Sequence, residues 1–373
     1  MKKAWALILV LCLLLTQWVW AGAQANAVTV IEIQKHGNLV LSVSGPKFFE
    51  MGFACGDVVT VGIGESTFDM PVGTNYSDVD NGELVCRVTD SRVILAINMG
   101  DLATAAGIAV KTKIEAEPGY RWDYSIPQPV EVTFTLKEAG GYYDEYVMHQ
   151  LTRTNERGDY AGLSDEAFAN FRKVTTTGMG KLYRSSSPVN PELNRSAYGD
   201  AAMKAAGVKT VINLADTNQG MKAYAGYADT YYQGCSIIGL NLGVDFMAED
   251  FKAGFAQGLR FILQNEGPYL IHCNEGKDRA GFTAAVLECL MGASADEVIA
   301  DYMTTYENYY GVAKGSDQYA AIARSNIEKS LSAAFEVEDI RGVALAEEAE
   351  VYLTQQLGLT PEEVVDLKAK LAD

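Results

Sequence analysis

The segment that most constrains the fold runs from Tyr269 to Phe282 and reads YLIHCNEGKDRAGF. Its first four residues form a short apolar run ending at His272, which is typical of a buried strand. A loop that contains a glycine follows, and a helix is predicted from about Ala280 to Met291. A strand that passes through a tight loop into a helix is a unit of parallel sheets, so the segment predicts an α/β fold.

The loop between these two elements has the chemistry of an anion-binding site. A tight turn here directs backbone N–H groups inward at a helix N-terminus, where the helix dipole also favours negative charge. Gly276 permits a backbone conformation that other residues resist, and Gly281 permits close packing behind the loop. The planar guanidinium of Arg279, which is separated from Cys273 by five residues in a Cys-x5-Arg arrangement, can bind two oxygens of one phosphate.

Cys273 is the predicted nucleophile, because the same donors stabilise its thiolate beneath a bound phosphoryl group. The alternative is a buried structural thiol, with Arg279 as a surface charge. His272 is expected to hydrogen-bond the loop backbone and orient Cys273, or else to be an ordinary buried histidine. The residues predicted to bind substrate come from the loop and from one earlier segment: His272, Asn274, Glu275, Gly276, Lys277, Ala280, Gly281 and Arg184.

The loop sequence HCNEGKDRAGF resembles the active-site loop of the protein-tyrosine-phosphatase superfamily. It is most similar to bacterial tyrosine and phosphoinositide phosphatases whose loop reads HCxxGKDRTG. Four further stretches resemble this family: NFR from Asn170, LYRS from Leu182, GVKTVINL from Gly207 and DYM from Asp301. In the family, the first three read NFRD, LYRS and GI-x-TV-x-DLR. The resemblance covers about residues 168–310. It implies a cysteine-dependent phosphatase that needs no metal or organic cofactor.

Two departures from the family pattern bear on the chemistry. The family usually carries Thr or Ser after the arginine, where this chain has Ala280. That hydroxyl assists the thiolate as a leaving group, so its loss puts the breakdown of the phosphoenzyme in question. Lys173 stands where NFRD has its aspartate, and Asn213-Leu-Ala stands where the family has DLR, so an acidic and a basic supporting residue are missing.

A general acid must protonate the leaving oxygen, and three aspartates compete for this role. In the relatives most similar to this chain the acid lies on a mobile loop before the catalytic one, which favours Asp245; an ordinary solvated carboxylate is the alternative. Asp278, inside the catalytic loop, is the rival acid, and it could instead brace Lys277 or the loop backbone. Asp216, just after a predicted strand, is the third candidate.

Phosphotyrosine proteins, phosphoinositides and soluble inositol phosphates all fit as substrates. Lys277 is expected to be exposed beside Arg279, where it could contact a second phosphate and favour the inositol compounds; a solvated lysine is the alternative. Arg184 is expected either near the pocket or in a surface salt bridge. His36 and His149 are isolated in the sequence, so no metal cluster is predicted.

The remaining catalytic segment alternates predicted strands and helices, which indicates a largely parallel sheet flanked by helices. Strands are expected at 210–214, 236–242 and 269–272, and helices at 201–206, 249–265, 347–357 and 361–371, the last with Thr360 as its N-cap. From 28 to about 136, short apolar runs separated by turn residues predict a small β-barrel or sandwich. The stretches from His36, Gly56 and Ala96 weakly resemble the β-barrel domain of S-adenosylmethionine hydroxide adenosyltransferases, which suggests a barrel without carrying their activity.

Residues 1–27 have the layout of a secretory signal peptide, with Lys2 and Lys3, an apolar run and small residues up to Ala27. The expected divisions are a signal peptide at 1–27, a β-rich domain at 28–138, a linker at 139–165 and a tyrosine-phosphatase-like domain at 166–373. The expected location is periplasmic, cell-surface or secreted. In such a compartment Cys55 and Cys86 could form a disulfide.

The net charge of −18 gives the chain no general attraction for nucleic acid or anionic lipid, and no stable membrane insertion is expected. An anionic substrate therefore requires a local positive site. Two other functions stay open at this stage. One is a phosphate-binding protein of the same fold without turnover, and the other is a rhodanese-type sulfurtransferase, which also uses a loop cysteine after a strand.

Overall fold

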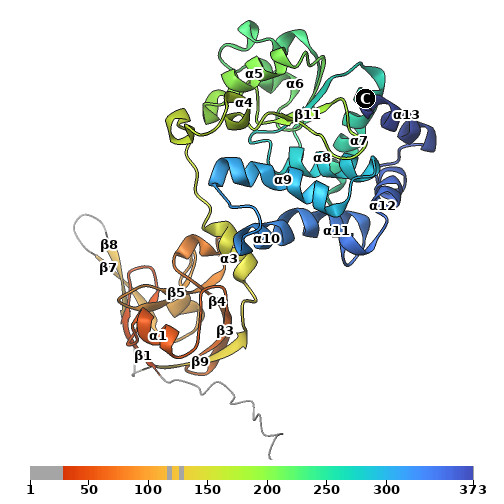
Figure 1. The fold of residues 1–373 in the computed structure, drawn as a ribbon. Coiled ribbons are helices and arrows are strands. Elements are labelled where there is room, and N and C mark those ends of the chain that lie inside the picture. Colours follow the sequence, from red (N-terminus) through yellow and green to blue (C-terminus); the bar gives the residue numbers. More distant parts are fainter. Residues whose placement is uncertain (1–27, 116–119, 126–129, 373) are drawn as a thin grey trace, which may run out of the picture. The chain divides into compact units, whose positions relative to one another are not determined.

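The structure, a computed structural model, describes residues 28–115, 120–125 and 130–372 (Figure 1). The predicted signal peptide lies outside the described residues. The chain divides between Gln150 and Leu151 into two compact units. The first is β-rich and the second is a mixed α/β unit, which confirms the predicted fold class.

The first unit is a closed barrel with the strand order β1-β2-β6-β5-β4-β3-β9. Apolar residues alternate along β3 (Val58–Ile63), where Val59, Val61 and Ile63 point into the core. The apolar runs predicted as strands, at 28–34, 39–43, 58–63, 84–88, 92–98 and 130–136, form six of the strands. The seventh, β4, was missed because its sequence STFDMPVG mixes apolar residues with Asp and Pro. The other strands are β1 (Val28–Ile33), β2 (Leu39–Leu41), β4 (Ser66–Gly73), β5 (Leu84–Val88), β6 (Val93–Ile97) and β9 (Glu131–Glu138).

Smaller elements complete this unit. The strands β7 (Val110–Glu115) and β8 (Tyr120–Ser125) pair as a separate antiparallel ribbon, and the helices are α1 (Gly45–Glu50) and α2 (Leu102–Ala105). The range 139–165, predicted as a linker, contains helix α3 (Tyr143–His149). The buried Val147 and a 2.8 Å hydrogen bond from the Tyr142 N–H to the Gly56 carbonyl fix α3 to the barrel unit. Cys55 and Cys86 are free thiols, and burial raises the pKa of Cys86.

The second unit is built on a five-stranded sheet in the order β10-β11-β14-β12-β13. The strands β11 (Leu182–Ser185), β14 (Tyr269–His272), β12 (Thr210–Asn213) and β13 (Ser236–Gly239) are parallel, and β10 (Arg172–Lys173) is antiparallel to β11. Their register aligns Ser185, His272, Asn213 and Gly239, so all four parallel strands end at one edge. In open α/β sheets this edge is where ligands bind.

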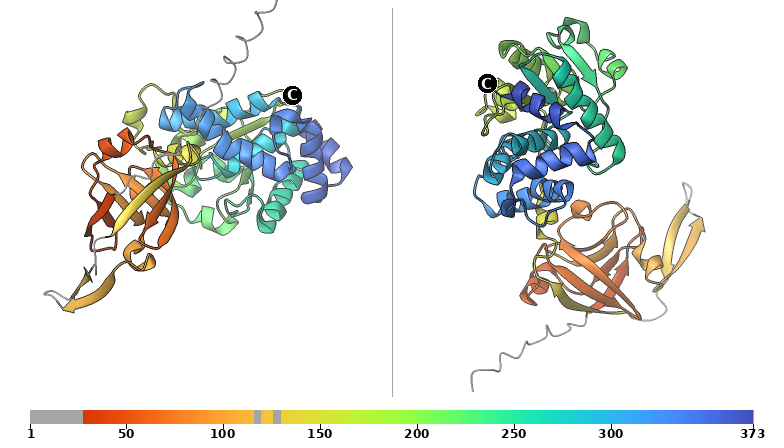
Figure 2. Two further views of the ribbon diagram at one scale, coloured as in Figure 1. Left: turned by 90° about the horizontal axis from the view of Figure 1, so that it is seen from below. Right: turned by 90° about the vertical axis from the view of Figure 1, so that its right-hand side faces the viewer.

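Helices cover both faces of this sheet (Figure 2). On one face, α5 (Ser196–Ala205) and α6 (Asn218–Lys222) pack on Val211 and Leu270. On the other, α7 (Glu249–Gln264) approaches β12 so closely that a Cβ at Gly258 would lie 3.1 Å from Ile212. The helix α8 (Arg279–Leu290) is buried from Ala280 to its end, which makes it the central helix of the unit.

Helix α9 (Ala295–Tyr310) lies beside α8 in Figures 1 and 2, followed by α10 (Asp317–Ala323), α11 (Lys329–Phe335), α12 (Leu345–Val351) and α13 (Pro361–Leu371). Of these helices, α9, α11 and α12 pack on α8, whereas α10 packs on α9 and α13 on α7. The predicted cap is present, since the Glu363 N–H donates to the Thr360 hydroxyl over 3.1 Å. No helix among the described residues has the length and apolarity needed to cross a membrane.

Candidate active site

The loop from Cys273 to Asp278 lies at the carboxyl edge of the sheet, between β14 and the N-terminus of α8. Cys273 is 2% exposed and follows directly on the buried strand. The segments that follow the neighbouring strands meet at the same edge. They carry Ser186 and Ser187 after β11, Asp216 after β12 and Asp245 after β13.

The carbonyl oxygens on the back of this loop are all bonded to neighbouring elements. The Ser187 N–H donates to the Asn274 carbonyl over 3.0 Å, and Asn170 and the Tyr309 hydroxyl donate to the Glu275 carbonyl over 3.0 and 3.1 Å. Nη2 of Arg184 donates to the carbonyls of Gly276 and Lys277 over 2.7 and 3.3 Å. Four successive carbonyls are thereby held on one side of the loop.

The N–H groups on the front of the loop are in the opposite situation. Within the part of the chain that the structure describes, the N–H groups of residues 274–278 donate to no protein acceptor. Unpaired N–H groups gathered at a helix N-terminus form a nest for an anion. The front of the loop thus has the donors that a phosphate group requires.

Two glycines are required for this geometry. Gly276 has a φ of +69°, and a Cβ there would lie 2.3 Å from the Ser185 carbonyl oxygen. At Gly281 a Cβ would lie 2.6 Å from the ring of Tyr302 and 2.8 Å from Arg184. Any side chain at either position would push the loop away from β11 or displace Arg184.

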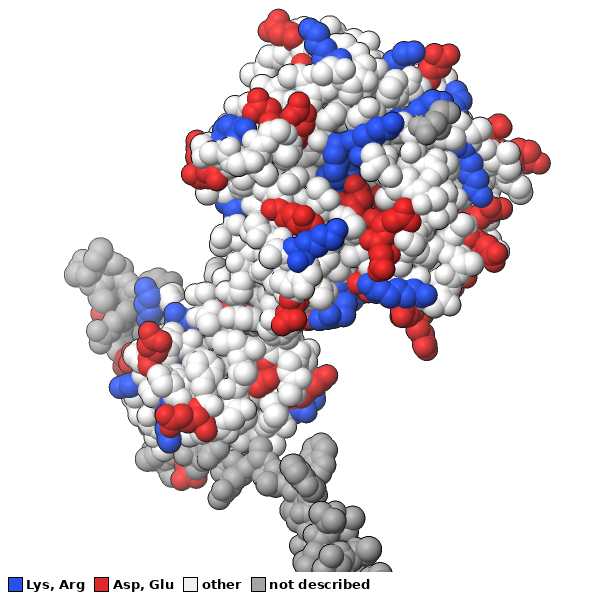
Figure 3. Space-filling model, viewed as in Figure 1, with Lys and Arg blue, Asp and Glu red and all other residues white. Residues whose placement is uncertain are grey.

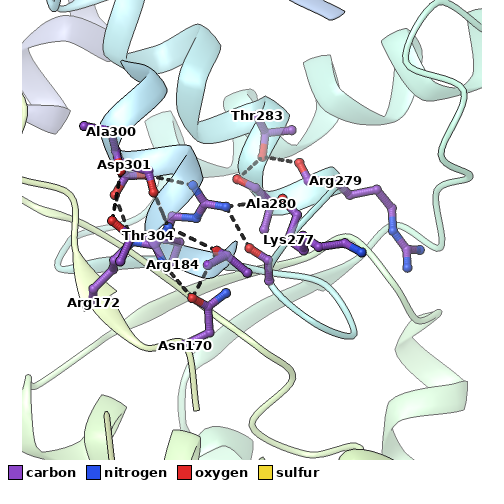
Figure 4. Close-up of polar contacts among 12 residues, drawn as sticks. Asn170, Arg172, Arg184, Lys277, Arg279, Ala280, Thr283, Ala300, Asp301 and Thr304 are labelled. Carbon is purple, nitrogen blue, oxygen red and sulfur yellow. Dashed lines mark hydrogen bonds and ion pairs between the residues drawn. The ribbon is translucent and has the colours of Figure 1, made fainter. Parts of the chain in front are cut away.

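A buried ion cluster fixes Arg184 under the loop (Figure 4). Arg184 is fully buried, and its Nη1 donates to Asp301 of α9 over 2.6 Å, while Arg172 of β10 donates to the other carboxylate oxygen over 2.9 Å. Burial disfavours the charge of Asp301, but the two guanidinium groups outweigh it and lower the pKa of Asp301. Arg172 also donates to Asn170, so the same cluster orients the side chain that holds the Glu275 carbonyl.

The side chain of Arg279 points away from this cluster, as Figure 4 shows, with Lys277 on the same side. One Nη donates to the Leu242 carbonyl over 2.8 Å, and Nε is buried without a protein partner among the described residues. Leu242 lies three residues before Asp245, so Arg279 links the catalytic loop to the loop after β13. The same nitrogen, Nη1, also donates to the Leu214 carbonyl over 3.5 Å, whereas Nη2 and Nε have no acceptor in the described structure and are available to a bound oxyanion.

His272 is fully buried in a chain of polar contacts. Its Nε2 is 2.8 Å from the Tyr232 hydroxyl, and that hydroxyl accepts from Asn213, which also donates to Asp216. Burial lowers the pKa of His272 to about 4, so the ring is neutral near pH 7. Its Nδ1 lies 3.4 Å from the Cys273 carbonyl, so its contacts are within the protein at the base of the loop.

The three candidate acids occupy different environments. Asp245 is exposed, and its carboxylate accepts the Met247 N–H over 3.1 Å. Asp216 is bonded to Asn213 and to the Tyr224 hydroxyl, which ties up its carboxylate. Asp278 lies next to Arg279 with a side chain that is 42% exposed, and burial, partly offset by Lys277, raises its pKa.

The charged residues at the loop rim form a second cluster. Glu275 accepts from Arg153 over 2.5 Å, and Lys277 lies 3.5 Å from its other oxygen. Lys277 was expected to be exposed, but its side chain is only 17% exposed and lies against Tyr306 and Tyr310. Burial opposes the charge of Lys277, but Asp278 and Glu275 outweigh burial and raise its pKa.

The sequence did not identify every member of the site. Arg184 was expected near the pocket or in a surface salt bridge. It is instead fully buried, paired with Asp301 and bonded to the back of the loop. Ala280 is also fully buried, whereas Asn274 is exposed. Arg153 was missed because it precedes the recognisable segment, and it lines a cleft of about 470 Å³ with Tyr309 and Tyr310. The only sequence sign of Asp301 was its place in the DYM stretch.

On the face shown in Figure 3, basic and acidic side chains are interspersed rather than gathered into one continuous positive surface. Arg153 and Lys277 beside Glu275, together with Arg279 at the end of the loop, supply local positive charge in a chain whose net charge is −18. Among the described residues, no three His, Cys, Asp or Glu side chains converge to hold a metal ion.

Two family models match the chain. The tyrosine phosphatase family matches residues 166–373, and the C-terminal domain of SAM hydroxide adenosyltransferases matches residues 28–115. The first match begins at the start of the predicted catalytic domain. The second coincides with most of the barrel. Both agree with the resemblances in the sequence.

Similar solved structures include the core catalytic domain of the PP-IP phosphatase SIW14 from S. cerevisiae, at 18% identity. The match covers 44% of this chain and 91% of that one, with a TM-score of 0.28. An uncharacterized conserved protein from Thermotoga maritima is 20% identical over 29% of this chain and only 35% of its own length, with a TM-score of 0.23. At these scores neither likeness supports an argument about function. No curated protein matches the chain.

Proposed function

The chain belongs to the tyrosine phosphatase family, and from this premise we propose that it hydrolyses phosphate monoesters through a cysteinyl-phosphate on Cys273. The observation that carries the proposal is the asymmetry of the loop. Its carbonyls are bonded behind it, and its N–H groups at 274–278 have no protein acceptor in the described structure. A phosphate bound by those donors would lie over the Cys273 sulfur.

The first step is an in-line displacement. The Cys273 thiolate attacks phosphorus, the bond to the ester oxygen breaks, and the leaving oxygen takes a proton from a carboxylic acid. Arg279 and the loop N–H groups bind the equatorial oxygens, where negative charge is concentrated in the transition state. In the second step, water attacks the cysteinyl-phosphate, its proton passes to the same carboxylate, and the thiolate is released.

We place Asp278 ahead of Asp245 as the general acid. Asp278 adjoins Arg279, and burial raises its pKa, which increases the fraction of the neutral acid that can donate a proton. Asp245 is exposed, and its carboxylate is already bonded to its own loop. Movement of that loop toward bound substrate is the route by which Asp245 would take the role instead.

For the substrate, we propose a phosphate monoester that carries a second anionic group, as phosphoinositides and inositol phosphates do. Three cations at the rim, Arg153, Lys277 and Arg279, lie beside only two carboxylates, those of Glu275 and Asp278, so the rim keeps an excess positive charge. A second phosphate could bind there by replacing Glu275 as the partner of these cations. Phosphotyrosine supplies no such group by itself, although acidic residues beside it could.

A phosphate-binding protein without turnover is the second candidate, and Ala280 favours it. The nearest hydroxyl on α8, that of Thr283, donates to the Arg279 carbonyl over 2.9 Å, so it does not replace the missing one. Without that hydroxyl, the thiolate is a poorer leaving group in the second step. We also propose, from residues 1–27 alone, that the protein is exported.

The test is phosphate release by the protein under reducing conditions from a phosphotyrosine peptide, phosphoinositides and inositol phosphates, with Cys273→Ser as the control. We expect release that is abolished in Cys273→Ser and is fastest with the inositol compounds. Unchanged release in the variant would refute the mechanism. Phosphate binding without release from any substrate would support the binding protein, and sulfur transfer from thiosulfate to cyanide would indicate a rhodanese.

A further inference from the structure

Glu288 is a carboxylate in the middle of the central helix. Every residue of α8 from Ala280 to Leu290 is buried, and Glu288 is 1% exposed. Apolar side chains would be expected at such a position, because a buried charge costs several kcal/mol unless it is paired. The mechanism described above does not use Glu288, so its presence in the core needs an explanation.

Glu288 belongs to the ion cluster under the catalytic loop but receives no hydrogen bond from it. The charges that act on its carboxyl group are those of Asp301 of α9, Arg184 of β11 and Arg172 of β10, and Glu288 adds to the effect of burial in raising the pKa of its neighbour Cys289. Both of its carboxylate oxygens are buried without a donor among the described residues. The two arginines direct their bonded N–H groups elsewhere: to Asp301, Asn170, Thr305 and the loop carbonyls of Gly276 and Lys277.

This arrangement favours the neutral acid over the carboxylate. An ionised Glu288 would be a buried anion beside a second anion, Asp301, with no donor directed at it. A protonated Glu288 has an O–H that can donate to the Asp301 carboxylate, and two adjacent carboxyl groups commonly share one proton in this way. Burial and Asp301 raise the pKa of Glu288 against the opposing effect of Arg184 and Arg172. The independent geometric observations are that Glu288 is 1% exposed and that neither of its carboxylate oxygens has a donor among the described residues.

We propose that Glu288 is a positioning residue that stays protonated, donates its hydroxyl to Asp301, and so completes the buried unit that holds Arg184 against the catalytic loop. Asp301 then has three donors around it: Arg172, Arg184 and Glu288. The effect on catalysis rests on the proposed phosphatase function. The hydrogen bond itself does not.

The proposal predicts how stability changes with pH. A carboxylic acid that is neutral in the folded protein ionises in the unfolded chain once the pH exceeds the usual pKa of glutamate. Above that pH, the free energy of unfolding therefore falls as pH rises. Its deprotonation in the folded state would set two anions against each other and loosen Asp301 and Arg184. Glu288→Gln keeps a donor of the same shape and cannot ionise, so it should abolish this part of the pH dependence.

The experiment compares the melting temperatures of wild type and Glu288→Gln between about pH 5 and about pH 9. We expect near-equal values at the acidic end and a gap of several degrees in favour of the glutamine variant at the alkaline end. Glu288→Leu should melt lower than Glu288→Gln throughout, because it leaves Asp301 without this donor. The matched control is Glu266→Gln, which alters an exposed glutamate and should produce no pH-dependent gap.

A second measurement follows the loop without requiring turnover. The probe is inorganic sulfate, whose charge is constant over this pH range, and both proteins carry Cys273→Ser. One of them also carries Glu288→Gln. As pH rises, the affinity for sulfate should fall at least several-fold more in the protein that keeps Glu288. The infrared spectrum should show a protonated carboxylic acid that is absent from Glu288→Gln.

The proposal is overturned if Glu288→Gln fails to fold or melts lower at every pH, or if the acid band is missing from wild type. Absence of sulfate binding in both chains would refute the anion site and leave the melting and infrared tests of Glu288 intact.

Discussion

The back and the front of the catalytic loop are built in opposite ways. Behind the loop, four successive carbonyls accept hydrogen bonds from β11, α9 and the segment before β10. In front of it, the N–H groups of residues 274–278 lack protein acceptors in the described structure. The hydrogen bonds to the carbonyls hold the loop in one conformation. The N–H groups in front therefore stay directed at one point even when no ligand is bound.

One arginine lies on each side of the catalytic loop, Arg184 behind it and Arg279 in front. Arg184 is fully buried, ion-paired and bonded to the loop, whereas Arg279 is partly exposed and has one strong hydrogen bond to the protein. The same side chain therefore serves structure in one place and ligand binding in the other. Substitutions at these positions should separate stability from chemistry.

The largest effect is expected from Arg184→Met. Removing this cation leaves Asp301 with one guanidinium partner and releases two loop carbonyls, so the free energy of unfolding should fall by about 3–5 kcal/mol and activity should be lost with it. Denaturant unfolding of the variant measures the first effect. Arg341→Met, which breaks an ion pair whose arginine is 46% exposed, should change stability by less than about 1 kcal/mol. Equal effects from both substitutions would contradict a bracing role for Arg184.

Arg279→Met should instead lower kcat by about 10²–10³ and leave the unfolding transition nearly unchanged. Arg279→Lys is the matched control, since it keeps the charge but loses the planar fork that binds two oxygens. We expect the lysine variant to recover only a small part of the activity. Full recovery would mean that charge alone acts here and would contradict two-oxygen binding by Arg279.

The sequence located the front of the loop far better than the back. Cys273, Gly276 and Arg279 lie within one contiguous motif, so their proximity follows from the chain itself. The bracing residues come from distant segments, and their contacts depend on tertiary packing that the strand and helix patterns do not specify. Arg184 and Asp301 were both within noticed stretches, but nothing in those stretches indicated that the two side chains meet under residue 276.

The architecture of the second unit was predicted as one type, a largely parallel sheet, whereas the first unit was left open between a barrel and a sandwich. At the level of strands the second unit was predicted less completely, because β10 and β11 were missed. Apolar runs such as those of β12 and β14 are short, continuous and followed by helices, which leaves few arrangements open. In the first unit, the separate ribbon of β7 and β8 was missed because most of the described side chains on it are polar or exposed, so little apolar alternation marks it. The partly buried Lys277 was predicted to be exposed because the tyrosines that pack against it lie on α9, far away in the sequence.

Asp278→Asn tests the acid at the front of the loop. With a substrate whose leaving group is strongly basic, kcat should fall about 10²-fold, because no proton reaches the departing oxygen. With an aryl phosphate whose leaving group is weakly basic, the fall should be slight. The wild-type rate should decline as pH rises through the raised pKa of Asp278, and the variant should lose that decline. Asp245→Asn is the matched substitution. If it produces the larger leaving-group dependence, the acid is Asp245.

The smallest effect expected is a gain, from Ala280→Thr. This residue is the first after Arg279, where a hydroxyl would stabilise the thiolate as it leaves the cysteinyl-phosphate. We expect wild type to show a burst of leaving-group release followed by slow turnover, and Ala280→Thr to raise the steady rate a few-fold and reduce the burst. Because Ala280 is fully buried, the larger side chain should also cost about 1–3 kcal/mol of stability. Ala280→Val has nearly the same shape and no hydroxyl, so it should share the loss of stability without the gain in rate. A gain with valine as well would show that packing, and not the hydroxyl, limits the second step.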